Sequence, residues 1–324
     1  MKSKISIVAV TLILAALPAF AQVKLILGHG TGLSSPRHEA ALYFADLVKK
    51  NSNGRIEVEV AGAARLGDDA AMVNALLAGT LDMSANSQGS VSAVVPEYNA
   101  FGMPFLFSDV TKAWKVLDGP LGKELAQKSA DKGLVVLGYW DNGIRQLSNN
   151  QKPILVPADL KHMNIRTPPD PVTIDIMEAL GANTYQIKFS DLYAALQQGV
   201  VTGQENPLVN INAGKLYEVQ KFISLTSHKY EMTPFLMSKR SWDRLPDADR
   251  GIILEAAGKA TQLQRKLAKA EEDKLLVELR AKGVRIDKVA LKPFITATSG
   301  VNDKWFASPI GDFTKRVVAA ARSN

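Results

Sequence analysis

The helical pattern of residues 247–282, the longest in the chain, is the feature that most constrains the fold. It follows Leu245-Pro246, is rich in Ala, Leu, Lys and Glu, and is stopped by Gly283. At about 1.5 Å per residue such a helix reaches on the order of 50 Å, which exceeds one small domain. A chain of 324 residues suggests about two domains. Because no linker tract occurs, we expect two lobes that are joined by several chain crossings and share this helix, continuous or kinked.

Strand and helix patterns alternate along most of the chain, beginning with short apolar strands at 23–27, 56–60 and 81–85. This order is typical of an α/β domain with a mainly parallel sheet. A second α/β unit is expected after Arg145. Further strands are predicted at 134–139, 165–167, 185–187, 200–202, 222–225 and 233–237. Helices are predicted from Pro36 after a cap at Ser35, from Asp69, at 109–118, 120–132 and 171–180, from a cap at Ser190, and at 207–217.

The first 21 residues have the pattern of a secretory signal peptide. Lys2 and Lys4 precede an apolar run at 5–17, and the A-x-A sequence at 19–21 predicts cleavage after Ala21. Removing 21 of 324 residues leaves 303. The run is too short to span a bilayer, and no later stretch approaches roughly 18 apolar residues. We therefore expect an exported protein without direct membrane insertion.

Composition excludes several kinds of site and partner. The chain has no cysteine, which excludes disulfides, thiolate chemistry and cysteine-ligated metals. The formal charge of +7 becomes +5 when Lys2 and Lys4 are removed. Because no Lys/Arg tract with interleaved aromatic residues occurs, nucleic acid is not an expected partner. The mild basicity fits either an anionic ligand or no specific function.

Two arginines and an amide, Arg145, Arg166 and Asn206, lie at or after predicted strands between 140 and 207. A guanidinium group is a charged planar fork that matches a carboxylate with two parallel hydrogen bonds. In doubly wound sheets, ligands bind in the crevice at the carboxyl ends of the strands. The three side chains are therefore a candidate anion clamp. The alternative is that each arginine forms a salt bridge with a neighbouring carboxylate.

Motifs for enzyme chemistry do not occur. The HEAAL stretch at 38–42 has Leu where HExxH needs its second histidine, so no zinc pair forms. No G-x-S-x-G elbow, Walker loop or G-x-G-x-x-G is present, and neither a cofactor nor a metal is expected. Asp68 and Asp69 suggest a pair of acid/base carboxylates, but aspartates at a helix N-terminus usually cap it. Of the scattered histidines, His29 alone follows a strand into the expected cleft, where it either contacts ligand or is structural.

Several short stretches together resemble one family. They are LGDDAAM at 66–72, GTLDM at 79–83, MPFLF at 103–107, IRTP at 165–168, and the run from Phe189 to GQENP at 203–207. The chain is similar in these stretches to the DctP-type solute receptors of TRAP transporters, and LYEVQKF at 216–222 extends the similarity over essentially all of the chain after residue 21.

The resemblance implies an α/β, two-lobed periplasmic-binding-protein fold of type II-like, Venus-flytrap form with an interlobe cleft. It also implies a periplasmic receptor, not an enzyme. Such a receptor captures an organic acid and delivers it to the small and large membrane subunits of a sodium-coupled TRAP transporter.

The resemblance also assigns roles to single residues. Arg166 matches the arginine that forms a two-pronged salt bridge with the ligand carboxylate. Arg145 matches the second arginine, and Asn206 matches the amide that completes the clamp. Phe189 matches an aromatic residue that packs against the ligand.

Residues of the first lobe are expected to meet the distal end of the ligand. Asp69 and Ser87 fall where the sialic-acid receptors of the family have acidic residues, and Gly30 falls where they have an asparagine. The serine and the glycine argue against sialic acid. His29 is a further candidate on this side.

A sugar acid, either a uronate or an aldonate, is the expected ligand. The polar residues expected to receive its hydroxyls are Asn86, Ser87, Gln88 and Asp69. Trp140 either offers an apolar face to the sugar ring or belongs to the core. A small dicarboxylate, hydroxy acid or keto acid is the alternative. A dicarboxylate needs a further cation, for which Arg37 and Arg65 are candidates, although both are interpreted more simply as surface residues.

The first lobe is predicted to combine 22–143 with 232–271, and the second to combine 144–231 with 272–324. An exported hydrolase or lyase that acts on sugar acids is a second functional class, and a module that presents the same fold to a sensor is a third. A monomer is expected, although the long helix offers a route to exchange between protomers.

Overall fold

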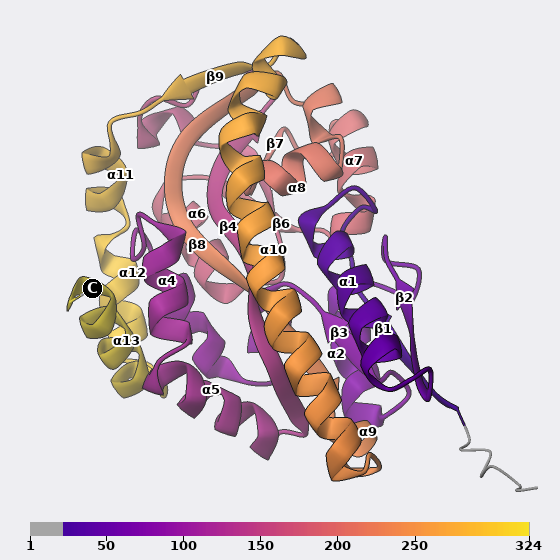
Figure 1. Cartoon of the computed structure of the whole chain (residues 1–324). Helices are drawn as coiled ribbons and strands as arrows, with labels where there is room; N and C mark the ends of the chain where they lie inside the picture. The colour runs from indigo at the N-terminus through magenta and orange to yellow at the C-terminus, as the bar shows by residue number, and fades with distance from the viewer. Residues whose placement is uncertain (1–21, 324) are drawn as a thin grey trace, which may run out of the picture.

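The computed structural model describes residues 22–323, so the predicted signal peptide lies outside the described residues. One mixed sheet runs through the described part of the chain (Figure 1). Its strands are β1 (Val23–Gly28), β2 (Ile56–Ala61), β3 (Met83–Ala85), β4 (Leu134–Asn149), β5 (Asn164–Thr167), β6 (Asn183–Gln186), β7 (Gly203–Asn206), β8 (Phe222–Ser238) and β9 (Arg285–Lys288). The order is β2-β1-β3-β8-β4-β7-β5-β6, with β9 beside β8.

Two parallel groups of strands are joined by a long antiparallel pair. β1 is parallel to β2 and β3, and β5 is parallel to β6 and β7. Between the groups, β4 and β8 pair with each other along almost their whole lengths, from Leu134 opposite Ser238 to Asn149 opposite Phe222. The two α/β units are therefore confirmed, and the long pair belongs to both.

The long strands β4 and β8 correct the predicted element boundaries. β4 was predicted to end at 139, and β8 was predicted as two strands, 222–225 and 233–237. In the stretch between those two, His228, Lys229 and Glu231 are fully buried. A strand that is polar and buried on both faces lacks the alternation of apolar and polar residues by which strands are predicted, so this part of β8 was missed.

Helices cover both faces of the sheet, and the long helix is confirmed. They are α1 (Pro36–Asn51), α2 (Asp69–Ala78), α3 (Gln88–Ser92), α4 (Val110–Leu117), α5 (Pro120–Asp131), α6 (Pro171–Ala179), α7 (Phe189–Gln197), α8 (Leu208–Ala213), α9 (Lys239–Asp243), α10 (Asp247–Ala281), α11 (Leu291–Ala297), α12 (Ser299–Phe306) and α13 (Gly311–Ser323). α10 passes across β4 and contacts both α1 and α8, which lie along the same side of it (Figure 1). It therefore braces both α/β units.

Local capping signals predicted most helix starts. The Ser35 hydroxyl accepts from the backbone N–H of His38 at the start of α1, with Pro36 in the first turn. The Asp68 carboxylate accepts from the backbone N–H of Ala71, and Gly79 ends α2 in the left-handed conformation.

The second unit shows three shifts from the prediction. α7 begins at Phe189 after Lys188, and Ser190 lies inside the helix instead of capping it. β6 begins two residues earlier than expected, at Asn183, and GQEN is itself strand β7, whereas a strand was predicted at 200–202.

The apolar core forms four clusters along the sheet. Phe313 and Val317 of α13 pack into the cluster that contains Tyr98 and Leu125, near α4 and α5. The predicted division had placed α13 in the second lobe. The division into lobes at 143–144, 231–232 and 271–272 stays a prediction. No helix within residues 22–323 is both long and apolar enough to cross a membrane.

Candidate functional site

A cleft opens between the two parallel strand groups and is lined from both sides. Gly30, after β1, and Asp69, at the start of α2, lie on one side, while Arg166 of β5 and Asn206 of β7 lie on the other. The space open to the centres of water molecules is about 90 Å³. One water needs roughly 10–15 Å³ by this measure, so the cleft has room for a small organic molecule.

Arg166 is a buried cation with an open end. Its side chain is part of the cleft wall and is 3% exposed. Its Nε donates to the Ile187 carbonyl oxygen at 2.7 Å. Among residues 22–323, neither terminal guanidinium nitrogen has a hydrogen-bond acceptor, and no carboxylate forms an ion pair with this arginine. Burial lowers the pKa of Arg166 to about 10, partly opposed by Glu205, so the group stays charged at neutral pH.

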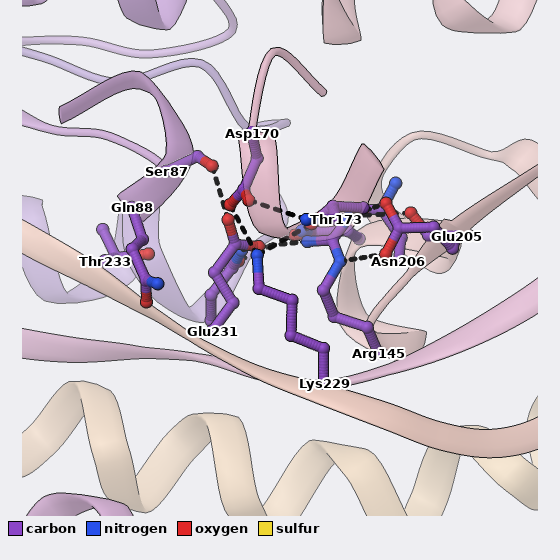
Figure 2. Close-up of polar contacts among 12 residues, drawn as sticks. Ser87, Gln88, Arg145, Asp170, Thr173, Glu205, Asn206, Lys229, Glu231 and Thr233 are labelled. Carbon is purple, nitrogen blue, oxygen red and sulfur yellow. Dashed lines mark hydrogen bonds and ion pairs between the residues drawn. The ribbon is translucent and has the colours of Figure 1, made fainter. Parts of the chain in front are cut away.

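Arg145 lies in the same cleft wall but is already paired (Figure 2). Its Nε donates to Glu205 Oε2 and its Nη1 to Glu231 Oε2. Its Nη2 donates to Glu205 Oε1 and to the Glu205 carbonyl oxygen, both at 2.7 Å, and to Asn206 Oδ1 at 3.2 Å. Two carboxylates thus share one guanidinium group, and the alternative of a salt bridge to a neighbouring carboxylate describes Arg145 in this structure.

The carboxylates that hold Arg145 were missed in the sequence. Glu205 and Glu231 are fully buried, on β7 and β8, and His228 Nε2 lies 3.2 Å from Glu205 Oε2. Burial alone would raise the pKa of Glu205, but Arg145 and the His228 hydrogen bond outweigh it and bring the pKa to about 2. Burial also acts upward on Glu231, yet Arg145 and Lys229 hold its pKa below the ordinary value. Both carboxylates are therefore ionised. Two features of the sequence could have indicated these carboxylates: Glu205 is the middle residue of the GQENP motif, and Glu231 ends the charged run at 228–231.

A second ion pair lies next to this network. Lys229 Nζ donates to Asp170 Oδ2 at 2.5 Å and to Thr173 Oγ1 at 2.8 Å (Figure 2). Asp170 also caps α6 through the backbone N–H of Thr173. The pair ties the middle of β8 to the start of α6, and all three side chains are fully buried.

Asn206 is oriented by three neighbours. Its Oδ1 accepts from Arg145 and from Asn210 Nδ2, each at 3.2 Å, and its Nδ2 donates to Gln204 Oε1 at 2.6 Å. One N–H of the Nδ2 amide is left over, and Asn206 lines the cleft. Phe189, the first residue of α7, is half-buried and also lines it. The structure thus brings Arg166, Arg145, Asn206 and Phe189 together.

The opposite wall carries three of the predicted residues. Asp69 Oδ2 accepts from the backbone N–H of Ser87 at 2.8 Å, and the Ser87 hydroxyl donates to Glu231 Oε1 at 2.7 Å. A Cβ on Gly30 would lie 2.5 Å from Asp69 Oδ1, so the glycine leaves the space in front of this carboxylate open. Burial raises the pKa of Asp69, while Arg37 and the Ser87 N–H oppose the shift.

Arg37 is not a surface residue, which corrects the prediction. It is the second residue of α1, is 5% exposed and lines the cleft. Its Nη2 donates to Asn142 Oδ1 at 2.9 Å and to Thr233 Oγ1 at 2.6 Å, and its Nη1 to the Ala85 carbonyl oxygen at 3.3 Å. Arg65, by contrast, is exposed, as predicted, and it pairs with Glu59.

Two predicted contact residues lie in the core instead of the cleft. Trp140 is fully buried, its ring centroid lies 4.7 Å from that of Phe235, and its Nε1 donates to Thr261 Oγ1. Because successive residues of a strand point to opposite faces, Trp140 packs under α10. His29 is also fully buried and lies 2.9 Å from His38 between ring nitrogens. Burial, with Arg37 and His38, lowers the pKa of His29 to about 3, so its imidazole is neutral and structural.

Two of the polar residues expected in the pocket are likewise absent from the cleft wall. Asn86 and Gln88 are fully buried. Gln88 Nε2 donates to the Tyr98 carbonyl oxygen, and Asn86 Nδ2 donates to Ser84 Oγ. Ser87 and Asp69 alone of the predicted polar set face the ligand space.

Lys188 and Asp68 form an ion pair across the mouth of the cleft. Lys188 precedes α7, Asp68 precedes α2, and their charged atoms lie 2.8 Å apart. Asp68 also keeps its capping bond to Ala71. Within residues 22–323, no cluster of three or more His, Asp or Glu side chains is placed to hold a metal ion.

Comparison with known proteins places this cleft in a family. Residues 27–308 match the model of the bacterial extracellular solute-binding protein, family 7, or DctP. The chain belongs to this family. It is a DctP-type solute-binding protein of TRAP transporters, as predicted from the sequence, and the family's two-lobed α/β fold is confirmed by its solved structures.

Individual relatives of this DctP-family chain add detail. The uncharacterized protein y4mM of Sinorhizobium fredii is 50% identical over 88% of this chain, which spans only 52% of that relative's length. The 2,3-diketo-L-gulonate-binding periplasmic protein YiaO of Escherichia coli is 33% identical over 87% of this chain and 88% of its own length. The crystal structure of the sugar acid binding protein DctPAm from Advenella mimigardefordensis, in complex with galactonate, superposes with a TM-score of 0.91 at 31% identity, covering 94% of this chain and 99% of that one.

Proposed function

We propose that this chain is a periplasmic receptor that captures a sugar acid, a uronate or an aldonate, by its carboxylate and delivers it to the small and large membrane subunits of a sodium-coupled TRAP transporter. One observation carries the proposal: Arg166 is buried in the cleft wall, and its two terminal nitrogens have no acceptor among residues 22–323. A buried cation without a partner is costly, and a carboxylate supplies the two acceptors that a guanidinium fork fits.

The other clamp residues complete the proposed binding mode. Arg145 donates to Asn206 Oδ1 and so orients the clamp amide, while Glu205 and Glu231 take up its charge. Asn206 offers the remaining N–H of its amide, and Phe189 offers an apolar surface. At the opposite wall, the Asp69 carboxylate and the Ser87 hydroxyl suit the hydroxyls of a sugar acid. Gly30 leaves room for them.

A small dicarboxylate, hydroxy acid or keto acid is the second candidate ligand. It is favoured by one observation, the buried guanidinium of Arg37 on the wall that the distal end of the ligand would reach. Export through a signal peptide cleaved after Ala21, and action as a monomer, belong to the same proposal.

A thermal-shift screen tests the proposal. The protein is produced by secretion of the full chain, stripped of ligand, and heated with uronates, aldonates, hydroxy acids, dicarboxylates, keto acids and sialic acid. A ligand at 100 times its dissociation constant adds about 2.7 kcal/mol to the free energy of unfolding. We expect a shift with sugar acids that disappears in Arg166→Ala and is reduced in Arg166→Lys, which keeps the charge but loses the fork. Shifts that persist unchanged in both variants would refute the clamp.

A further inference from the structure

Arg37 and Asp69 form an unusual pair in the distal wall of the cleft. Both line the same space, and both come from the N-terminal α/β unit. Each lies within the electrostatic influence of the other. Nevertheless, no ion pair forms between them, and no other carboxylate within residues 22–323 forms an ion pair with Arg37. The Arg37 guanidinium group and the Asp69 carboxyl group thus line one cavity without forming an ion pair with each other.

The surroundings hold the two groups apart. Arg37 is fixed by Asn142, Thr233 and the Ala85 carbonyl oxygen, none of which is charged. Asp69 is fixed by the backbone N–H of Ser87 through Oδ2. Its other oxygen, Oδ1, faces Gly30, where a Cβ would approach to 2.5 Å.

The unused bonding capacity of the two groups is complementary. Arg37 Nε and the second hydrogen of Nη1 have no acceptor among the described residues, and Asp69 Oδ1 accepts no hydrogen bond from them. A guanidinium group only donates, and an ionised carboxylate only accepts. A hydroxyl is both donor and acceptor and can satisfy the two together. An ionised carboxylate placed there would satisfy Arg37 but has no hydrogen to donate to Asp69 Oδ1.

We propose that Arg37 is a specificity-determining residue that, with Asp69, recognises a hydroxyl at the distal end of the ligand. The inference rests on the proposed function, since it takes the ligand carboxylate to be held by Arg166. It narrows the ligand class to hydroxylated monocarboxylates and disfavours acids with a second carboxylate at that end. Arg37, the residue that favoured a dicarboxylate, is thereby assigned to donate a hydrogen bond to a ligand hydroxyl.

Three acids of equal carbon number test the inference by isothermal titration calorimetry. Galactonate carries hydroxyls, hexanoate carries none, and galactarate has a carboxylate in place of the terminal hydroxymethyl group. In the unaltered protein we expect galactonate to bind at least about a hundredfold more tightly than hexanoate, because the analogue leaves polar groups unpaired. We also expect it to bind more tightly than galactarate.

Variants connect this preference to Arg37. Arg37→Met is expected to weaken galactonate binding by about tenfold to a hundredfold, which corresponds to the loss of one charge-assisted hydrogen bond. The affinity for hexanoate is expected to stay unchanged. Gly30→Ala tests the same space without disturbing the anchors of Arg37, since its methyl would crowd Asp69 Oδ1. This variant is also expected to weaken the binding of galactonate and not that of hexanoate. Arg65→Met, at an exposed arginine, is the matched control.

The outcomes separate the inference from the function on which it rests. Tighter binding of galactarate, or equal losses for all three acids in Arg37→Met and in Gly30→Ala, would overturn the inference. Failure of all hydroxylated monocarboxylates, with Arg166-dependent binding of succinate or a keto acid, would also overturn it and leave the carboxylate clamp intact. Binding that does not depend on Arg166 would overturn the clamp itself.

Discussion

Arg145 and Arg166 look equivalent in the sequence, yet the structure surrounds them with opposite environments. Both are buried in the same cleft wall. Arg145 is held by two buried carboxylates, whereas among residues 22–323 only one carbonyl oxygen holds Arg166, which keeps its fork open. Within this part of the chain the first arginine has carboxylate partners and the second has none. The comparison teaches that a ligand site is recognised by unmet bonding capacity more than by residue type.

The largest expected effect comes from removing the paired arginine. Arg145→Ala leaves Glu205 and Glu231 buried without their cation, which is expected to lower the free energy of unfolding by about 3–5 kcal/mol. Urea unfolding of the ligand-free protein measures it. Arg145→Lys retains one charge and is expected to lose less. A loss no larger than that of the exposed control Arg65→Ala would contradict the paired description.

The reciprocal experiment removes the open arginine. Arg166→Ala is expected to abolish acid binding while the ligand-free protein stays as stable as before or becomes more stable, because an unpaired buried charge has been removed. Calorimetric titration and urea unfolding of the same preparation measure both quantities. A large loss of stability in the ligand-free variant would show that Arg166 has a structural partner after all.

Acid should destabilise the buried ion-pair network around Arg145. The pKa of Glu205 falls from an ordinary value of 4.5 to about 2 in the folded protein. Its contribution to stability is therefore fully present above about pH 4.5 and is lost as the pH falls toward 2. Glu205→Gln is expected to flatten the pH dependence of the unfolding free energy in that window. The control is Glu59→Gln, at an exposed carboxylate, and an unchanged slope in Glu205→Gln would contradict the assignment.

The smallest expected effect lies at the cleft mouth. Lys188 and Asp68 are joined across it, but Lys188 is largely exposed. Exposed ion pairs contribute little and are screened by salt. Lys188→Ala is expected to speed ligand dissociation slightly at low salt and not at high salt, as followed by stopped-flow fluorescence. An effect on dissociation that matches that of Arg166→Lys would place Lys188 within the clamp instead.

Much of the fold could be predicted because its signals are local. The caps at Ser35 and Asp68, the stop at Gly283 and the helical pattern of α10 each depend on a few neighbouring residues. β8 could not be predicted as one strand, because its buried charges are stabilised by partners that are distant in sequence. Lys229 depends on Asp170, 59 residues away.

The candidate site was predicted only in part, because some of its residues belong to local motifs and others depend on partners that are distant in sequence. Arg166 and Asn206 were selected by motif, and the structure brings them together. The burial of Arg37 depends on Asn142 and Thr233, which lie 105 and 196 residues away, so a local pattern could not reveal it. Trp140 was expected just after a strand that ends at 139, but β4 continues to Asn149 and Trp140 lies within it, buried in the core.

The distal-wall residues and the Arg145 network come from different parts of the chain, and this separation has a consequence for the evolution of ligand preference. Gly30, Arg37 and Asp69 lie within the first 70 residues, whereas Arg145 and its two carboxylates lie in β4, β7 and β8. Exchange of this N-terminal segment leaves Arg145 with both of its carboxylates, and of the groups that hold Arg37 only the uncharged side chains of Asn142 and Thr233 come from distant parts of the chain. A crossover between β7 and β8 would instead join Arg145 and Glu205 to a Glu231 that had not evolved with them. New specificities in this protein should therefore arise from its N-terminal segment.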